Sequence, residues 1–388
     1  MTTFERDQQY ILPTYARFPL EIVRGNGAYC YDNNGKEYID LGSGIAVNTL
    51  GFADDGWVCA VTEQLKKFQH TSNLYYSAPC AELAEALCTR TGYSRVFFSN
   101  SGAEANECAI KAARLYAARK KDVTDGYIIT LTNSFHGRTV TTLAATGQDS
   151  FHRDFTPLTG GFLYAAPCME EIERLTSEYP CIAVMLEMIQ GEGGVNQMPI
   201  EFVTALAAFC QKNGLLMIAD EVQTGNGRTG KLYAYMNYGI MPDIISTAKG
   251  LAGGLPLGAT MMTEEVASVF AYGLHGSTFG GNPVACAGAL HILNCLTDEF
   301  LAGVDERAAL IQQMLVGAPG IRSVSGLGLM VGIEPVGNAK EIILACMERG
   351  VICLSAKQKI RLLPPLNIPL DALKKALSVI LEECAKRA

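Results

Sequence analysis

Two charged residues directly follow apolar segments that have the length of buried strands. Asp220 comes after Leu215–Ala219, and Lys249 follows a strand-like segment that begins at Ile244. A buried carboxylate is costly without a partner, which could be the protonated ring nitrogen of a cofactor or an arginine of the core. Burial of Lys249 would lower the pKa of its amine and favour the neutral form that imine chemistry needs. A lysine exposed on the surface is the alternative.

A third segment has the residues of an anion site at the start of a helix. Ser101, Gly102 and Ala103 follow the apolar run Arg95–Phe98 and open a helical pattern. Small residues at a helix N-terminus leave backbone N–H groups free to bind a phosphate. The alternative is a capping turn, with Ser101 as N-cap and Glu104 three residues later.

An aromatic residue and an arginine come three positions apart after the strand-like run Tyr127–Leu131. Phe135 and Arg138, next to Gly137, could stack on a planar ligand and bind a carboxylate through two hydrogen bonds. The alternative is a surface loop, which this pattern alone favours.

The segment Gly225–Gly230 matches the GxGxxG pattern of dinucleotide-binding folds. That pattern requires its first glycine at the end of a strand and an acidic residue about 20 positions later. Here Asp220 and Gln223 separate the strand from Gly225, and Asp243 lies only 13 positions beyond Gly230. We therefore do not favour a nicotinamide cofactor.

A parallel sheet would bring these segments together. Apolar runs of strand length alternate with helical patterns such as Ala103–Arg119 and Glu201–Lys212. This alternation predicts an α/β domain whose largely parallel sheet has helices on both faces and its ligands at the carboxyl ends of the strands. The predicted strands are Arg95–Phe98, Tyr127–Leu131, Ile182–Leu186, Leu215–Ala219 and Ile244–Ser246.

The two ends of the chain have a different pattern. Residues 20–40 have the pattern of short strands separated by turn-forming residues. The last 90 residues have the pattern of helices around short strands such as Ile360–Leu363. A chain of 388 residues is also longer than one core usually supports. We predict a large domain over residues 46–284 and a smaller α+β domain built from residues 1–45 and 285–388.

Composition excludes several classes of protein. Lys and Arg number 31 against 39 Asp and Glu, so the net charge of −8 gives no general attraction for nucleic acid or anionic lipid. The 13 cysteines form no CxxC pair, and we predict neither a metal site nor a disulfide scaffold.

Two segments of the sequence bear on where the protein is located and on whether it crosses a membrane. The first ten residues lack the basic and apolar blocks of a signal peptide, so we expect a cytoplasmic protein. Residues Val266–Thr297 carry no Asp, Glu, Lys or Arg, but glycines and Pro283 interrupt them. We expect this segment to line a cleft or a subunit interface rather than to cross a membrane.

Together these segments resemble the fold-type I, class III pyridoxal-phosphate-dependent aminotransferases, most closely the members that use N-acetylornithine. The resemblance runs nearly from end to end and implies pyridoxal 5'-phosphate as cofactor. It also implies a mainly parallel seven-stranded sheet in the large domain. The segments that carry it are Tyr29–Asp40, Ser43–Asn48, His70–Tyr75, Ser101–Asn106, Phe135–Arg138, Gln190–Gly194, Asp220–Gln223, Gly227–Gly230, Lys249, His275–Pro283 and Arg361–Pro365.

The resemblance implies roles around the cofactor ring. Lys249 would bond to the cofactor and, once released by substrate, move a proton between the two reacting carbons. Asp220 would keep the pyridine nitrogen protonated, which makes the ring an electron sink. Phe135 would stack on the ring, and Gln223 would contact its phenolic oxygen.

The resemblance also implies how the phosphate is bound. Gly102 and Ala103 would bind it through their backbone amides, with help from Ser101. Thr278 would bind the phosphate of the other subunit's cofactor, which implies a homodimer with two shared active sites.

Two arginines are implied as carboxylate-binding residues. Arg138 would bind the α-carboxylate of N-acetylornithine, with Ser277 nearby. Arg361 would bind the α-carboxylate of 2-oxoglutarate, and Glu192 would pair with Arg361 when the amino donor is present.

The implied reaction moves the δ-amino group of N-acetylornithine to 2-oxoglutarate. The products are N-acetylglutamate 5-semialdehyde and glutamate, within arginine biosynthesis. Ornithine, succinylornithine and 4-aminobutyrate are rival donors on the same scaffold. Gly44 stands where ornithine-specific members tend to carry a tyrosine, which favours the acetylated donor.

A regulatory protein that binds the cofactor without turnover is the non-enzyme alternative. Lys249, Asp220 and the two arginines argue against it.

The sequence departs from the family pattern at two places. Met188 stands where the family usually carries proline after glutamate, and Asp54-Asp55 stands where a His-Pro pair is common. Neither place carries a predicted site residue.

Overall fold

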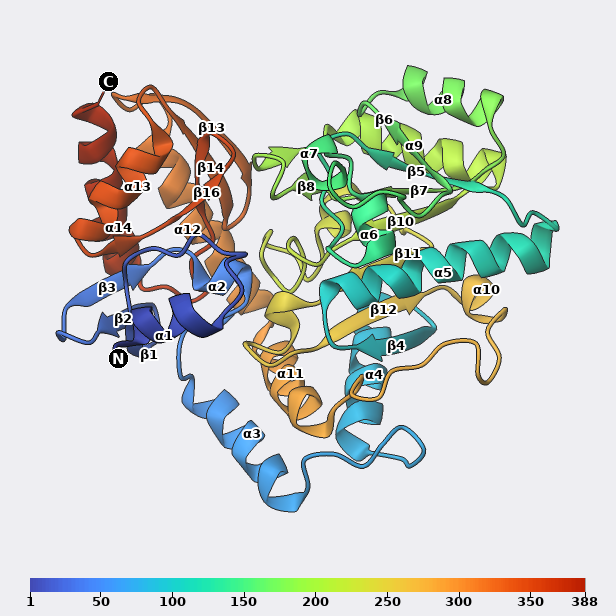
Figure 1. Ribbon diagram of the computed structural model, residues 1–388, viewed down its shortest axis with the longest axis horizontal. Coiled ribbons are helices and arrows are strands. Elements are labelled where there is room, and N and C mark those ends of the chain that lie inside the picture. The colour runs from blue at the N-terminus through green and yellow to red at the C-terminus, as the bar shows by residue number, and fades with distance from the viewer. Residues whose placement is uncertain (388) are drawn as a thin grey trace.

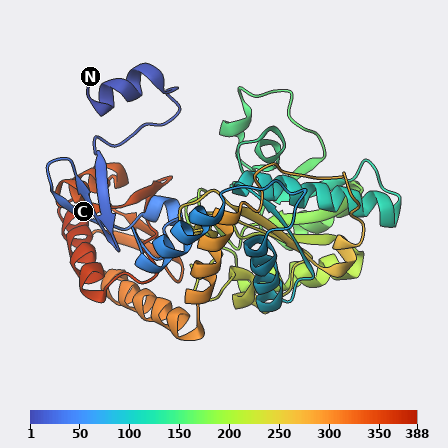
Figure 2. The same cartoon turned by 90° about the horizontal axis from the view of Figure 1, so that it is seen from below.

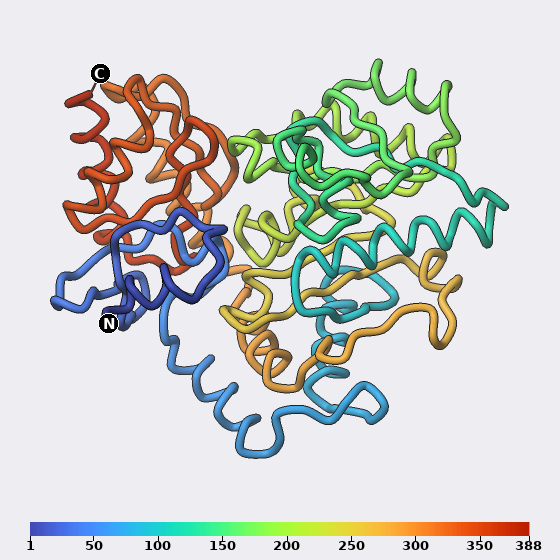
Figure 3. Tube along the Cα trace, viewed as in Figure 1, coloured from blue at the N-terminus to red at the C-terminus, as the bar shows by residue number. Residues whose placement is uncertain are grey.

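The computed structural model describes residues 1–387 of the chain. Figure 1 shows two bodies side by side, one formed by the middle of the chain and one in which both termini lie. The trace in Figure 3 shows the blue N-terminal residues crossing the body that is otherwise built from the orange and red C-terminal residues. The division into domains at residues 46 and 284 stays a prediction.

A seven-stranded sheet forms the centre of the larger body, in the order β4-β12-β11-β10-β7-β5-β6. β12 runs antiparallel to both of its neighbours, while β11, β10, β7, β5 and β6 are parallel to one another. The predicted fold class is confirmed. The strands are β4 (Arg95–Ser99), β5 (Tyr127–Leu131), β6 (Phe162–Ala165), β7 (Cys181–Leu186), β10 (Leu216–Asp220), β11 (Ile244–Thr247) and β12 (Gly258–Met262).

Helices cover both faces of this sheet because successive strand residues point to opposite sides. In β5, Ile128 packs in the cluster around α5 (Gly102–Lys121). Its neighbour Ile129 packs in the cluster that includes α8 (Met169–Glu178) and α9 (Ile200–Asn213). The near-continuous apolar sequence of these strands follows from this two-sided burial.

The second body contains two four-stranded sheets. In the first, β15 from the C-terminal part pairs in parallel with β3 from the N-terminal part, so both ends of the chain build one sheet. The second sheet is antiparallel throughout. The strands are β1 (Ile22–Asn26), β2 (Tyr29–Asp32), β3 (Glu37–Asp40) and β15 (Val351–Ile352), then β13 (Ile321–Leu327), β14 (Met330–Pro335), β17 (Lys359–Leu362) and β16 (Leu354–Ala356).

Further helices and short strands complete the fold, and α1 stands apart from the rest. α1 has no buried residue, and Figure 2 shows it held away from the rest of the molecule. The remaining elements are α1 (Thr3–Tyr10), α2 (Ser43–Ala46), α3 (Asp55–Lys67), α4 (Ala78–Thr91), α6 (Val140–Ala145), α7 (Asp149–His152), β8 (Ile189–Gln190), β9 (Asn196–Gln197), η1 (Ala234–Tyr238), η2 (Lys249–Leu251), α10 (Glu264–Ala267), α11 (Pro283–Cys295), α12 (Asp298–Leu315), α13 (Ala339–Glu348) and α14 (Leu370–Ala385).

Within residues 1–387, no single helix is long and apolar enough to cross a membrane. The pair α11 and α12 has the length and composition only when the two helices are taken together, and it is bent by 74° between them. Within α11, residues such as Cys286, Ala289 and Ile292 are buried in the protein core.

Candidate active site

A pocket of about 460 Å³ opens at the carboxyl ends of the strands of the large sheet. β4, β5, β7, β10 and β11 each lead into a lining residue, which is where a parallel sheet places its ligands. Nine of the predicted site residues line this pocket: Ser101, Gly102, Ala103, Phe135, Arg138, Glu192, Asp220, Gln223 and Lys249. Arg361 contacts two of them, while Ser277 and Thr278 lie outside the lining.

The first turn of α5 forms one end of the pocket. The Ser101 side chain accepts a hydrogen bond from the Glu104 amide, so the predicted capping turn is present. Within residues 1–387, the amides of Gly102 and Ala103 have no acceptor. A Cβ on Gly102 would lie 2.5 Å from Val222 Cγ1, so a larger residue there would force Val222 to shift. Two free amides at a helix N-terminus fit an anion such as phosphate.

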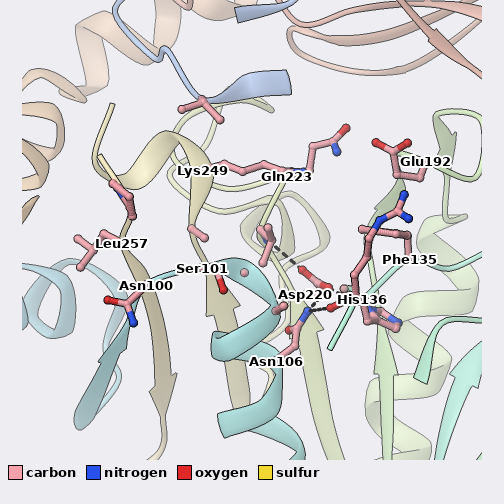
Figure 4. A pocket seen from close by; sticks show the side chains of 18 of the residues that line it. Asn100, Ser101, Asn106, Phe135, His136, Glu192, Asp220, Gln223, Lys249 and Leu257 are labelled. Carbon is pink, nitrogen blue, oxygen red and sulfur yellow. Dashed lines mark hydrogen bonds and ion pairs between the residues drawn. The ribbon is translucent and has the colours of Figure 1, made fainter. Parts of the chain in front are cut away.

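Asp220 lies in the middle of the pocket at the end of β10 and is only 3% exposed. Its Oδ2 accepts hydrogen bonds from Asn106 Nδ2 and His136 Nδ1, both at 2.8 Å. Its Oδ1 accepts from the Val222 amide at 3.0 Å. Figure 4 shows these bonds converging on Asp220 below Lys249. The buried carboxylate is therefore fixed in direction, as a partner for a cationic group in the pocket requires.

Asn106 and His136 were missed by the sequence analysis as site residues. His136 donates through Nδ1, while its Nε2 is buried and has no partner within residues 1–387. Asn106 also donates to the His136 carbonyl and accepts from Ser246 Oγ. Both residues lie in segments that carry the family resemblance. Their role in orienting the carboxylate is visible only from contacts with Asp220, which lies 114 positions from Asn106 and 84 from His136.

Glu187 is a further lining residue that sequence reasoning did not select. Its carboxylate accepts hydrogen bonds from the amides of Phe135 and Gly191. Burial raises the pKa of Glu187 to about 7. The carboxylate therefore holds the loop that carries Phe135 against the end of β7.

Lys249 follows β11 and lines the pocket, where it is half-buried. Burial lowers the pKa of its amine, opposed by the negative charges of Glu192, Asp220 and Glu187. The amine makes no hydrogen bond within residues 1–387. A desolvated amine with a lowered pKa and no partner is suited to act as a nucleophile or a base.

Arg361 and Glu192 form an ion pair at the side of the pocket. Arg361 Nη1 donates to Glu192 Oε1 at 2.6 Å and to Gln223 Oε1 at 3.2 Å. Burial alone would raise the pKa of Glu192, but the charge and hydrogen bond of Arg361 outweigh it and lower that pKa. The pair joins β17 of the smaller sheet to loops of the larger one.

Arg138 is the exposed cation at the pocket mouth. Its guanidinium carbon lies 5.6 Å from the centre of the Phe135 ring and 4.9 Å from that of Phe151. The two rings orient the guanidinium and leave its N–H groups free for a carboxylate.

Ser277 and Thr278 lie in the charge-free loop between α10 and α11. Ser277 Oγ accepts from Asn100 Nδ2, a pocket residue, at 3.2 Å. Thr278 is exposed and does not reach this pocket.

The two departures from the family pattern lie away from the reacting groups. Met188 is fully buried in the core, and its carbonyl accepts hydrogen bonds from Tyr238 Oη and the Met198 amide. Asp54 is the N-cap of α3 and also pairs with His291.

Comparison with known proteins agrees with this geometry. The family model described as "Aminotransferase class-III" matches residues 10–383. Acetylornithine aminotransferase of Haemophilus ducreyi is 46% identical over 377 residues, covering 96% of each chain. Acetylornithine aminotransferase of Caldanaerobacter subterraneus is 43% identical over 390 residues, covering 98% of each chain.

Solved structures with similar folds are also aminotransferases. Ornithine aminotransferase of Toxoplasma gondii, with partial occupancy of PLP at its active site, superposes with a TM-score of 0.94 at 30% identity, covering 99% of this chain and 94% of its own. N-acetylornithine aminotransferase of Stenotrophomonas maltophilia gives a TM-score of 0.85 at 33% identity, covering 99% and 98%. With the family model matching nearly the whole chain, the protein belongs to the class III aminotransferases.

Proposed function

We propose that this protein transfers the δ-amino group of N-acetylornithine to 2-oxoglutarate, giving N-acetylglutamate 5-semialdehyde and glutamate in arginine biosynthesis. The observation that carries the chemistry is the pocket that places the partner-free amine of Lys249 beside the fixed carboxylate of Asp220. The choice of donor is supported by the full-length relatives that are acetylornithine aminotransferases.

Pyridoxal phosphate, the cofactor of this family, fits the residues of the pocket. The free amides of Gly102 and Ala103, with Ser101, would hold its phosphate. Asp220 would pair with its ring nitrogen, and when bound the cofactor supplies an electron sink for the substrate carbon that loses a proton.

Phe135 and Gln223 would complete the ring site. Glu187 holds the Phe135 loop, so that Phe135 would face the ring of the cofactor. Gln223, fixed by Arg361, would contact the phenolic oxygen.

Lys249 would hold the cofactor covalently and would then act as the base. Desolvation lowers the pKa of its amine, so the amine is neutral more readily than that of a surface lysine. A neutral amine held close to the substrate accepts a proton from one carbon and returns it to another.

Two arginines would orient the two substrates. Arg138 would bind the α-carboxylate of N-acetylornithine through its fork of N–H groups, with Ser277 nearby. Arg361 would bind the α-carboxylate of 2-oxoglutarate after Glu192 releases it, because one guanidinium edge cannot serve both carboxylates. With the donor present, Glu192 would keep Arg361 neutralised.

We further propose that two copies form a homodimer with shared sites. Large apolar side chains are exposed in two loops beside the pocket, 70–77 and 271–282: Leu74, Tyr75, Tyr76, Tyr272, Leu274 and Phe279. Patches of this kind mark protein interfaces. Thr278, in the same loop, would reach the phosphate site of the second copy. A cytoplasmic location stays a prediction of the sequence.

A panel of amino donors with 2-oxoglutarate as acceptor tests the proposed reaction. We expect kcat/KM for N-acetylornithine to exceed that for ornithine at least about tenfold, because Gly44 offers no hydroxyl to a free α-ammonium. Succinylornithine and 4-aminobutyrate complete the panel. Equal efficiency with ornithine would contradict the choice of donor, and no turnover with any donor would contradict the transaminase.

A further inference from the structure

The short segment α2 (Ser43–Ala46), beside the pocket, is wound in the left-handed sense. The φ angles of Ser43, Gly44, Ile45 and Ala46 are 47°, 62°, 67° and 61°. Left-handed backbone is unfavourable for residues with a Cβ, and most of all for a β-branched residue such as Ile45. Strain of this kind persists only where the surroundings impose it.

Asp40, the last residue of β3, imposes this conformation. Its Oδ1 accepts hydrogen bonds from the amides of Gly42 at 2.7 Å and Ser43 at 3.0 Å, and its Oδ2 accepts from Ser43 at 3.1 Å. The carboxylate is 5% exposed and pairs with no cation in the described part of the chain. A buried carboxylate bonded only to two amides at the start of a strained turn fixes that turn.

The turn in its place packs on the backbone that carries Lys249. A Cβ on Gly250 would lie 2.6 Å from Thr49 Oγ1 and 3.3 Å from the Ala46 carbonyl oxygen. Thr49 Oγ1 also donates to the Gly250 carbonyl at 2.8 Å. Lys249 itself has a φ of 47°, so its backbone is strained in the same way.

Figure 1 shows α2 on the inner side of its body, facing the larger one. Val47, the residue directly after the turn, lines the pocket together with Lys249. A change in the turn would therefore reach both the wall of the pocket and the attachment of the lysine.

We propose that Asp40 is a positioning residue for Lys249: it fixes the turn Ser43–Ala46 against Gly250 and so sets the direction in which Lys249 enters the pocket. This inference rests on the proposed function, because it requires that Lys249 bond to the cofactor. Asp40 itself is not among the residues that line the pocket.

Asp32 provides a matched control in the same sheet. Its Oδ1 also accepts two backbone amides, those of Asn34 and Lys36, both at 2.9 Å, and it is 8% exposed. The turn that it fixes contributes no residue to the pocket. Loss of Asp32 and loss of Asp40 should therefore both lower stability, while only the second should change the active site.

The experiment compares wild-type, Asp40→Ala and Asp32→Ala protein, each saturated with pyridoxal phosphate. The first readout is the pH midpoint of the absorption change of the bound cofactor. This midpoint reports the environment of the bond between the cofactor and the lysine. For Asp40→Ala we expect this midpoint to shift by about half a pH unit or more, since the charges around the lysine sit at changed distances. We expect kcat to fall about tenfold with KM for both substrates nearly unchanged. Asp32→Ala should lower only the thermal midpoint.

A second substitution separates positioning from general damage. Glycine adopts positive φ without a steric penalty, so Ile45→Gly should relieve the strain that Asp40 otherwise holds in place. Ile45→Gly alone should behave like wild type, and Asp40→Ala with Ile45→Gly should recover most of kcat and the wild-type midpoint. If Asp40→Ala does not fold, Asp40→Asn serves instead, with smaller changes in the same direction and the same recovery.

Wild-type midpoint and kcat in Asp40→Ala, or no recovery in the double variant, would overturn the inference and leave the proposed function standing. Failure of the proposed function itself would be recognised by a different result. Borohydride reduction of the wild-type holoenzyme would then leave Lys249 unlabelled, whatever Asp40→Ala does.

Discussion

At the scale of single residues, the site depends on groups that fix one another. Asp220 is held by three hydrogen bonds, and its donors Asn106 and His136 are themselves bonded to each other. Such a network orients the carboxylate before any ligand arrives, which avoids reorganisation during the reaction.

Asp220→Asn should keep the shape of the pocket while removing the charge that stabilises a protonated ring nitrogen. We expect kcat to fall by about 1,000-fold or more, or about 4 kcal/mol of barrier, with a modest loss of cofactor affinity. Steady-state kinetics and cofactor titration measure the two effects. Unchanged turnover would mean that another group protonates the ring.

Arg138→Lys should weaken the use of N-acetylornithine because a point charge cannot replace a bidentate fork. We expect kcat/KM for the donor to fall about 10- to 100-fold, with a smaller change in the half-reaction with glutamate. Arg114→Lys is the control, since Arg114 also lies near an aromatic ring, Phe162, but outside the active-site pocket. An equal loss in both half-reactions would mean that Arg138 serves both substrates and not the donor in particular.

The sequence predicted the residues of this site unevenly, for a physical reason. Lys249 and Asp220 stand out because a charge directly after an apolar strand needs an explanation. Asn106, His136 and Glu187 act through contacts with residues far along the chain, and nothing in their own neighbourhood shows this.

At the scale of elements, the strands with long apolar runs were predicted to within a residue or two. β5 spans Tyr127–Leu131 as predicted, and β10 is shifted by one residue to Leu216–Asp220. β12, with the sequence Gly-Ala-Thr-Met-Met, was not among the strands read from apolar runs, because it carries a single β-branched residue. The left-handed α2 was also missed, since its conformation contradicts the local preference of three of its four residues.

Glu383 near the end of α14 stabilises the smaller body through charge. It is 4% exposed and pairs with Arg349, Lys386 and Arg387, whose hydrogen bonds lower its pKa to about 2. A carboxylate whose pKa is lowered in the folded state stabilises it above the usual pKa, and this stabilisation is lost as pH falls toward about 2.

Glu383→Gln should therefore lower the free energy of unfolding at pH 7 by about 1–2 kcal/mol, a value reduced because its cationic partners are partly exposed. The difference from wild type should shrink steadily between pH 5 and pH 2, in denaturation followed at about 0.1 M salt. Glu382→Gln is the control, because Glu382 is mostly exposed and pairs with Arg349 alone. If the difference in the free energy of unfolding does not depend on pH, the effect of Glu383 comes from packing and not from its charge.

At the scale of the whole molecule, the proposed homodimer predicts complementation between two inactive variants. Lys249→Ala lacks the reacting amine, and Thr278→Asp would repel the phosphate in the second copy's site. In a mixed dimer, the site with an intact Lys249 receives its Thr278 from the other subunit and works. Random assembly after co-expression should give about a quarter of wild-type activity, since half of the dimers carry one good site of two.

Light scattering should show a dimer for each parent variant and for the mixture. Activity no higher than that of the parents would contradict shared sites, even if the protein is dimeric.

The central claim is that Lys249 bonds to pyridoxal phosphate, and reductive trapping tests it most directly. The wild-type holoenzyme is treated with borohydride, digested and mapped by mass spectrometry, with Lys249→Ala as the matched variant. We predict one labelled peptide, with the cofactor on Lys249, and in Lys249→Ala no covalent label and a rate lower by many powers of ten. A label on another lysine, or a variant that keeps more than about a tenth of the wild-type rate, would contradict the account.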